Sequence, residues 1–186
     1  TSTHSIRTLA LDNNKIIVGG NFIYYNGTLK RQIIRLNNNG SIDNTLNIGT
    51  GLGGGNGVSH LIVDSNGKIL MCGEWGLYNN VQVLSKDQYI IRLNPDGSKD
   101  DSFNISGTGF NNQFVNHIAI QDNNKFIITG NFISYNGFSN RGIIRLNYDG
   151  SIDNSFDYSG GGISSSPTWG MVFNSLLLNN KIYIVG

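Results

Sequence analysis

The sequence predicts an all-β protein built from one repeated unit, and three observations support this prediction. A segment that begins with lysine and continues through Arg-Leu-Asn to Ser-x-Asp recurs almost unchanged from Lys15, Lys68 and Lys125. A further copy opens at Lys181 with the letters KIYIVG. No segment carries a sustained helical period of apolar residues. Such arrays are stable because neighbouring units bury the apolar faces that each unit leaves open.

Composition agrees with short strands joined by tight turns. The 186 residues include 25 glycines and only 2 prolines, with frequent Asn-Gly and Asp-Gly pairs that tolerate positive φ and close hairpins. The net charge is +1 and 13% of the residues are charged, so we expect neither nucleic-acid binding nor attraction to an anionic membrane. The apolar runs are far shorter than the ~20 residues of a membrane helix, so we expect no membrane insertion.

The single cysteine, Cys72, rules out a disulfide within the chain. It lies in the apolar segment KILMCG, which is typical of a strand. We therefore predict a buried structural thiol rather than a reactive one.

Each unit contains four predicted short strands, and the third copy shows them most clearly. The strands are expected at residues 115–120, 125–130, 142–146 and 151–156, separated by turns rich in Asn, Asp and Gly. Between the second and third strands, the letters YNG within 132–139 indicate a hairpin or loop. Four antiparallel strands in roughly 55 residues fit one blade of a β-propeller.

The predicted fold is therefore a single partial β-propeller over residues 1–186, with repeats at 4–57, 58–114, 115–170 and an incomplete 171–186. This gives about 3.4 four-stranded blades, whereas closed propellers typically have 4–8. We expect the chain to be part of a longer protein with roughly six or seven blades. The alternative is closure of the ring by a second copy of the chain. Uncovered strand edges would otherwise invite association.

Two sets of letters carry a resemblance to a known family. The third copy contains IAIQDNNKFIITGNF and IIRLNYDGSIDNSF, and the second contains LIVDSNGKILMCGEW and IIRLNPDGSKDDSF. This pattern resembles the delta-60 repeat. It departs from that repeat locally at Trp75, Leu46 and Asn39. The resemblance implies a β-propeller of the kind found in bacterial surface or secreted proteins and in bacteriophage tail or virion proteins. It implies no general set of catalytic residues.

Charged residues recur at fixed positions of the unit. They are the arginines Arg35, Arg92 and Arg145 and the aspartates Asp43, Asp100 and Asp153. The aspartates could be calcium ligands, since their loops are rich in oxygen donors. Alternatively, each aspartate caps backbone N–H groups in a turn and pairs with the strand arginine. We favour this structural interpretation because the set recurs in every unit, and we predict neither a metal site nor a cofactor. The lysines that open the second strands are expected to be exposed.

The histidines give no sign of catalysis or metal binding. His60 and His117 occupy equivalent strand positions, and Arg7 is aligned with them in the first copy. They belong to neighbouring units without a third histidine or a cysteine nearby, so we expect no metal site there. The sequence contains no Gly-x-Ser-x-Gly elbow and no phosphate-binding loop. We therefore expect that the protein is not an enzyme.

Differences between the copies point to candidate binding residues. The second unit has a longer segment at 76–88, and insertions in repeats often map to the binding face. A second irregular segment at 163–170 contains Trp169. The aromatic side chains of Trp75, Tyr78 and Trp169 could stack on sugars or anchor a protein partner. The alternative is that they pack over the rim of a blade.

Three functions remain open from the sequence. The first is a non-enzymatic structural or interaction module of a larger surface or virion assembly, whose partners are other protein subunits or remaining blades. The second is a carbohydrate- or receptor-binding adhesin domain. The third is a propeller enzyme whose site lies on other blades. The first is favoured, and it implies an extracellular, cell-surface or virion location.

Overall fold

The computed structural model describes residues 4–111, 114–160, 162–163, 172–179 and 181–186. Within these ranges the chain forms antiparallel sheets, one short 3-10 helix, η1 (Ser85–Asp87), and no α-helix. The all-β prediction is confirmed. No helix of the described part is long and apolar enough to cross a bilayer.

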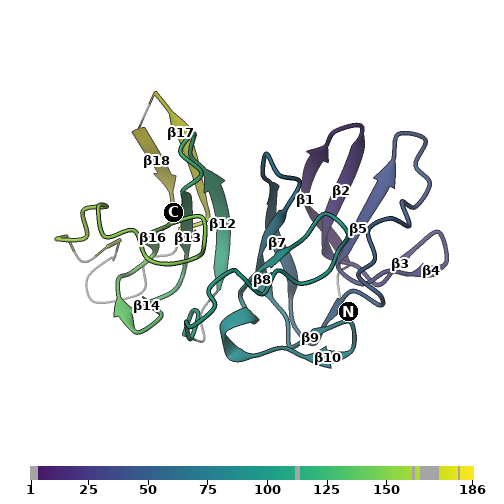
Figure 1. The fold of residues 1–186 in the computed structure, drawn as a ribbon, viewed down its shortest axis with the longest axis horizontal. Coiled ribbons are helices and arrows are strands. Elements are labelled where there is room, and N and C mark those ends of the chain that lie inside the picture. Colours follow the sequence, from purple (N-terminus) through teal and green to yellow (C-terminus); the bar gives the residue numbers. More distant parts are fainter. Residues whose placement is uncertain (1–3, 112–113, 161, 164–171, 180) are drawn as a thin grey trace.

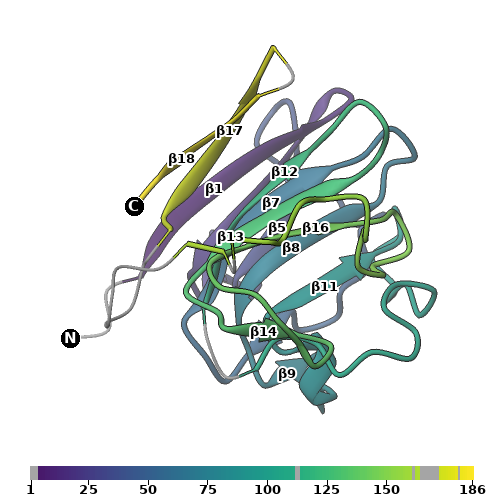
Figure 2. The same ribbon diagram turned by 90° about the vertical axis from the view of Figure 1, so that its left-hand side faces the viewer.

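The long strands form four sheets that stand side by side in chain order, from the right of Figure 1 to its left. Figure 2 shows that the axes of these strands are inclined the same way, although neighbouring strands within a sheet are antiparallel. The first sheet comprises β1 (Ser5–Asp12), β2 (Lys15–Asn21) and β5 (Ile33–Asn37); the second β7 (Gly57–Val63), β8 (Ile69–Glu74) and β11 (Ile90–Leu93); the third β12 (Val115–Ile120), β13 (Phe126–Gly130) and β16 (Ile143–Leu146); the last β17 (Asn174–Leu178) and β18 (Lys181–Val185).

The sheets pack face to face, as the blades of a propeller do. Their first strands, β1, β7, β12 and β17, contact one another in succession and form the inner side of the array. Alternate residues of β8 enter two apolar layers: Ile69 and Met71 pack toward the first sheet, while Leu70 and Cys72 pack toward the third. The core is therefore distributed between blades, as expected for a repeat array.

Cys72 is fully buried. Burial raises the pKa of its thiol, so the group stays protonated. The prediction of a buried structural cysteine is confirmed.

Each of the first three inner strands carries a β-bulge. Opposite the bulged segment, the second strand of each of these blades has a glycine: Gly20, Gly73 or Gly130. A Cβ atom at these positions would lie 2.1, 2.1 and 2.3 Å from a backbone oxygen at the start of the inner strand or, in the third blade, from that of Phe114 just before it. The repeated glycine is therefore required by the close approach of two backbones.

The fourth strand of each predicted blade is shorter than expected. In the third blade the segment 151–156 contributes a single bridge, between Leu146 and Ile152, and then turns away. The cause is Asp153, whose side chain accepts the backbone N–H of Ser155 at 3.0 Å and so stabilises a turn instead of an extended strand. Equivalent single bridges join Leu36 to Ile42 and Leu93 to Lys99.

Short hairpins connect the second and third strands of the first three blades. They are β3 (Tyr24–Tyr25) with β4 (Thr28–Leu29), β9 (Leu77–Tyr78) with β10 (Val81–Gln82), and β14 (Ser134–Tyr135) with β15 (Phe138–Ser139). Both central residues of each turn have positive φ, for example 49° at Asn136 and 78° at Gly137, which is type I′ geometry. The hairpin expected from the letters YNG is confirmed. The strand β6 (Leu52–Gly53) adds to β9 in the second blade.

Candidate functional site

A three-residue ionic cluster recurs at the same place in the first three blades. Its centre is the aspartate that directly follows the single β-bridge of the fourth-strand segment. Its partners are the arginine of the third strand and the lysine that opens the second-strand segment. The Arg Nε to Asp Oδ2 distances are 2.6 Å for Arg35–Asp43, 2.7 Å for Arg92–Asp100 and 2.6 Å for Arg145–Asp153. The Lys Nζ to Asp Oδ2 distances are 2.8 Å for Lys15–Asp43, 2.6 Å for Lys68–Asp100 and 2.7 Å for Lys125–Asp153.

The hydrogen bonds of each cluster involve both carboxylate oxygens. Asp43 Oδ1 accepts the N–H and the hydroxyl of Thr45 at 3.0 and 2.7 Å, while Oδ2 accepts Lys15 and Arg35. Burial alone would raise the pKa of Asp43, but these donors outweigh it and hold the pKa below its usual range. A calcium ion would have to displace two cations from this carboxylate. The geometry is that of a structural turn.

The expectation that the repeated lysines are exposed is wrong for three of them. The side chains of Lys15, Lys68 and Lys125 are only 34%, 24% and 25% exposed, and each ammonium group bonds an aspartate. The apolar stem of lysine can lie along the sheet while its charge reaches the aspartate. The pattern of a lysine after a tight turn does not reveal this partner, which comes from a segment far along the chain.

Trp75 lies inside the second blade rather than on a binding surface. Its side chain is 1% exposed, packs in the apolar layer between the first two sheets and donates its indole N–H to Asp87 O at 2.7 Å. The ring therefore cannot contact a partner unless the blade rearranges, and we do not propose it as a binding residue. Trp169, the third aromatic candidate, lies outside the described residues.

Tyr78 has counterparts in two other blades. The hydroxyl groups of Tyr25 and Tyr135 donate to the glycine carbonyl of the turn before the aspartate, at 2.7 and 2.8 Å, and that of Tyr78 donates to Gly97 O. Burial, with a contribution from nearby Asp96, raises the pKa of Tyr78 to about 12, so its hydroxyl remains a donor. The recurrence of tyrosine before each hairpin turn is the sequence signal of this structural role.

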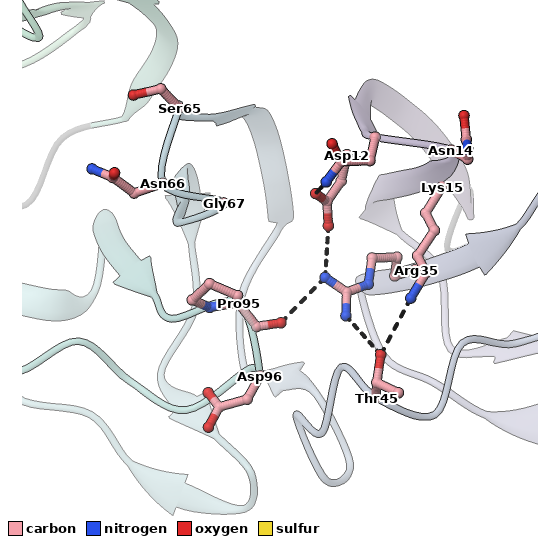
Figure 3. A pocket seen from close by; sticks show the side chains of 11 residues that line it. Asp12, Asn14, Lys15, Arg35, Thr45, Ser65, Asn66, Gly67, Pro95 and Asp96 are labelled. Carbon is pink, nitrogen blue, oxygen red and sulfur yellow. Dashed lines mark hydrogen bonds and ion pairs between the residues drawn. The ribbon is translucent and has the colours of Figure 1, made fainter.

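A polar cleft of about 800 Å³ lies between the first two blades (Figure 3). It is bounded by the turn before β2, by residues 65–67 and by Pro95 and Asp96. Arg35 is 5% exposed and lies at its wall, where its Nη1 donates to Asp12 Oδ2 at 2.7 Å and to Pro95 O at 3.2 Å. Its Nη2 donates to the hydroxyl of Thr45 at 3.1 Å. The cleft therefore presents a buried planar cation beside a carboxylate.

The corresponding place between the second and third blades is filled by Tyr148. The centre of its ring lies 4.5 Å from the guanidinium carbon of Arg92, and Arg92 Nη1 donates to the backbone oxygen of Tyr148. The tyrosine hydroxyl donates to Asp64 Oδ2 at 2.7 Å and accepts from Asn66 Nδ2 at 3.0 Å. The repeat pattern alone does not predict the cleft. The sequence signal is that one position of the equivalent turns is occupied by Pro95 in the second blade and by the larger Tyr148 in the third.

His60 and His117 meet on the inner strands of neighbouring blades. Their ring centroids lie 3.9 Å apart. The two rings therefore converge, and Cys72 lies opposite His60 in the strand register, so the expectation that no cysteine is nearby is wrong. No group of three or more His, Cys, Asp or Glu that could hold a metal occurs among the described residues. Arg7 is not their counterpart. The bulge leaves Arg7 unpaired in the strand register and places Thr8 at the equivalent position.

The sequence was also compared with known protein families. A family described as "Domain of unknown function (DUF5122) beta-propeller" matches residues 11–46, 65–103 and 121–156. The chain belongs to the DUF5122 β-propeller family. A comparison with curated proteins gave no match.

Each segment that matches the DUF5122 family contains one complete Lys–Asp–Arg cluster and one tyrosine hairpin. The matches establish a β-propeller repeat and the position of the clusters within it. His60, His117 and the other inner-strand residues of the second and third blades lie outside the matched segments.

Proposed function

We propose that this chain is a non-enzymatic interaction module, in which the open faces of the first and last blades are covered by further blades of the same repeat type. In a larger assembly these blades belong to other protein subunits or to the remaining part of the same protein. The observation that carries the proposal is the exposed apolar face of the first blade.

The inner strand of the first blade carries apolar side chains at positions that neighbours cover in the other blades. Leu61 and Ile118, on the second and third inner strands, are each 1% exposed. Leu9 occupies the same position of the repeat on β1 and is 64% exposed. Because the position is apolar in each of the first three blades, its natural neighbour is the face of another blade.

The last blade is open in the same way. On its sheet Leu176 pairs with Tyr183, and these side chains are 61% and 48% exposed. Leu178 and Val185 extend this face and are also exposed. Large exposed apolar patches are typical of interaction surfaces.

A structural role also accounts for the repeated charged residues. Their carboxylates bond lysine and arginine in each of the first three blades, so these groups stabilise turns and have no free position for substrate chemistry. We include in the proposal that the chain is not an enzyme. The resemblance to the delta-60 repeat supports a place in a bacterial surface or secreted protein or in a virion, and we propose this setting as well.

Sedimentation velocity of the purified 186-residue protein tests the proposal. We expect concentration-dependent association, and we expect Leu9→Asp to weaken it at least about tenfold because a charge is buried against an apolar face. Leu84→Asp is the matched control, since Leu84 is 63% exposed on a loop of the second blade. A monomer at all concentrations, or an equal effect of both variants, would contradict the proposal. Saturable glycan binding unaffected by Leu9→Asp would instead favour the carbohydrate-binding alternative.

A further inference from the structure

We propose that the cleft between the first and second blades binds a planar aromatic ring that bears a hydroxyl group. The ring lies against Arg35 and Pro95, and its hydroxyl donates to Asp12. The ligand is either the side chain of a tyrosine from another chain or a free phenol. This inference is independent of how the end faces of the protein are covered.

The template for this ligand is part of the same molecule. Between the second and third blades, the ring of Tyr148 lies over the guanidinium group of Arg92 and its hydroxyl reaches Asp64. Burial raises the pKa of Tyr148, and Asp64 raises it further, so the hydroxyl keeps the proton that it donates. A phenol is therefore a shape and a hydrogen-bonding pattern that this kind of cleft accepts.

The first cleft has the same parts, apart from the aromatic ring. Arg35 corresponds to Arg92, and each donates from Nη1 to the backbone oxygen at the same turn position of the next blade. Asp12 corresponds to Asp64 at the end of the inner-strand segment. Pro95 stands where the next blade has Tyr148, and its short ring leaves the space that the cleft occupies.

The charges of the cleft favour a neutral ligand over an anion. Arg35 is paired with Asp12 and Asp43, and Lys15 is paired with Asp43. Asp96 adds a further carboxylate at the rim. A phosphate or carboxylate would have to compete with these groups, whereas a carboxylate oxygen can accept another hydrogen bond from a neutral hydroxyl.

Titration of the 15N-labelled protein with N-acetyl-tyrosinamide, followed by NMR, tests the inference. We expect saturable shifts of the Asn14, Ser65 and Gly67 amides with a Kd on the order of 1 mM. N-acetyl-phenylalaninamide, which lacks the hydroxyl, should bind at least about fivefold more weakly. A Gly-Tyr-Gly peptide that binds more tightly than p-cresol would identify a tyrosine side chain as the source, and equal affinities would identify a free phenol.

Two variants locate the ligand. Pro95→Tyr should abolish binding because the introduced ring occupies the cleft, as Tyr148 does in the next one. Asp12→Asn should weaken the binding of N-acetyl-tyrosinamide about tenfold and leave the affinity for N-acetyl-phenylalaninamide unchanged. The positive control is Tyr148→Ala, whose emptied cleft should take up p-cresol.

The inference would be overturned by three results. One is that Tyr148→Ala takes up p-cresol while N-acetyl-tyrosinamide causes no saturable shifts of the cleft amides in the original protein. Another is unchanged binding in Pro95→Tyr. The third is an equal loss of affinity for N-acetyl-tyrosinamide and N-acetyl-phenylalaninamide in Asp12→Asn. This would mean that the hydroxyl does not reach Asp12.

Discussion

The imidazole rings of His60 and His117 stack across the boundary between two blades, with their centroids 3.9 Å apart and their planes inclined by 35°. His60 Nδ1 accepts the backbone N–H of Ile118 at 3.4 Å, so this nitrogen carries no proton. In the first blade the hydroxyl of Thr8 plays the same part, accepting the N–H of Leu61 at 3.3 Å. One side chain on each of the first two inner strands thus accepts a hydrogen bond from the next strand.

This pair predicts that the protein loses stability in mild acid. Burial lowers the pKa of His60 from 6.5 to about 4, with a further contribution from His117, whose own pKa is lowered by burial. Between pH 6.5 and about 4 the unfolded chain binds more protons than the folded one, so the free energy of unfolding falls as the pH is lowered. We expect a loss of about 1–3 kcal/mol across this window, measured by urea denaturation at several pH values.

The control for the pH prediction is His60→Thr. Threonine retains an acceptor for the Ile118 N–H, as Thr8 does for Leu61, but it does not titrate. We expect this variant to reduce the dependence between pH 6.5 and 4 to the part that His117 contributes, while the loss below pH 3.8, which comes from the buried aspartates, remains. An unchanged slope above pH 4 would show that the histidine pair is not its source.

Removing the aspartate of one ionic cluster should be strongly destabilising. Asp100 and Arg92 have side-chain exposures of 6% and 2%, and Lys68 donates to the same carboxylate oxygen. Asp100→Ala leaves two cations without their partner, and we expect the free energy of unfolding to fall by about 3–5 kcal/mol. Chemical denaturation at pH 7 measures this change.

The neighbouring residue supplies the control for the cluster. Asp101 is 82% exposed and pairs with Lys99, so Asp101→Ala should change stability by no more than about 0.5 kcal/mol. If both variants lost the same stability, the effect would come from the turn conformation or from net charge and not from the buried cluster.

The sequence predicts the features of this fold that depend on local chemistry. The Asn136-Gly137 pair forms its hairpin because both residues tolerate positive φ, and the alternating apolar residues of β8 enter two layers because strand side chains alternate. The β-bulge of β1 does not follow from local chemistry. It arises where β1 pairs with β2, and it places Thr8 instead of Arg7 at the position that the histidines occupy in the next two blades.

Contacts between blades could not be read from the repeat. The tyrosine ring over Arg92 and the stack of His60 on His117 join residues that are 56 and 57 positions apart. A repeated pattern identifies equivalent positions, but it does not say which of them meet across a blade boundary. The candidate cleft at Arg35 depends on such a contact, and for that reason it becomes visible only in the structure.

Calcium should not stabilise this protein. In the second blade Asp100 Oδ2 accepts Lys68 and Arg92, and Oδ1 accepts the N–H and hydroxyl of Ser102. An ion would have to displace donors that together outweigh the effect of burial and lower the pKa of Asp100. Scanning calorimetry should give the same Tm, within about 1 °C, with millimolar calcium and with chelator. A Tm that rises with calcium and falls on chelation would identify the aspartate turns as ion sites.

The hydroxyl of Tyr78 should matter for stability to the same extent as its counterpart in the third blade. Tyr78 donates to Gly97 O, and Tyr135 donates to Gly150 O at 2.8 Å. Tyr78→Phe and Tyr135→Phe each leave one turn carbonyl without this donor, so we expect each to lower the free energy of unfolding by about 1 kcal/mol. Urea denaturation measures both variants, and sedimentation of the same samples should show unchanged association. Weakened association in Tyr78→Phe, with stability equal to that of the original protein, would instead assign Tyr78 to a binding surface and not to the architecture of the blade.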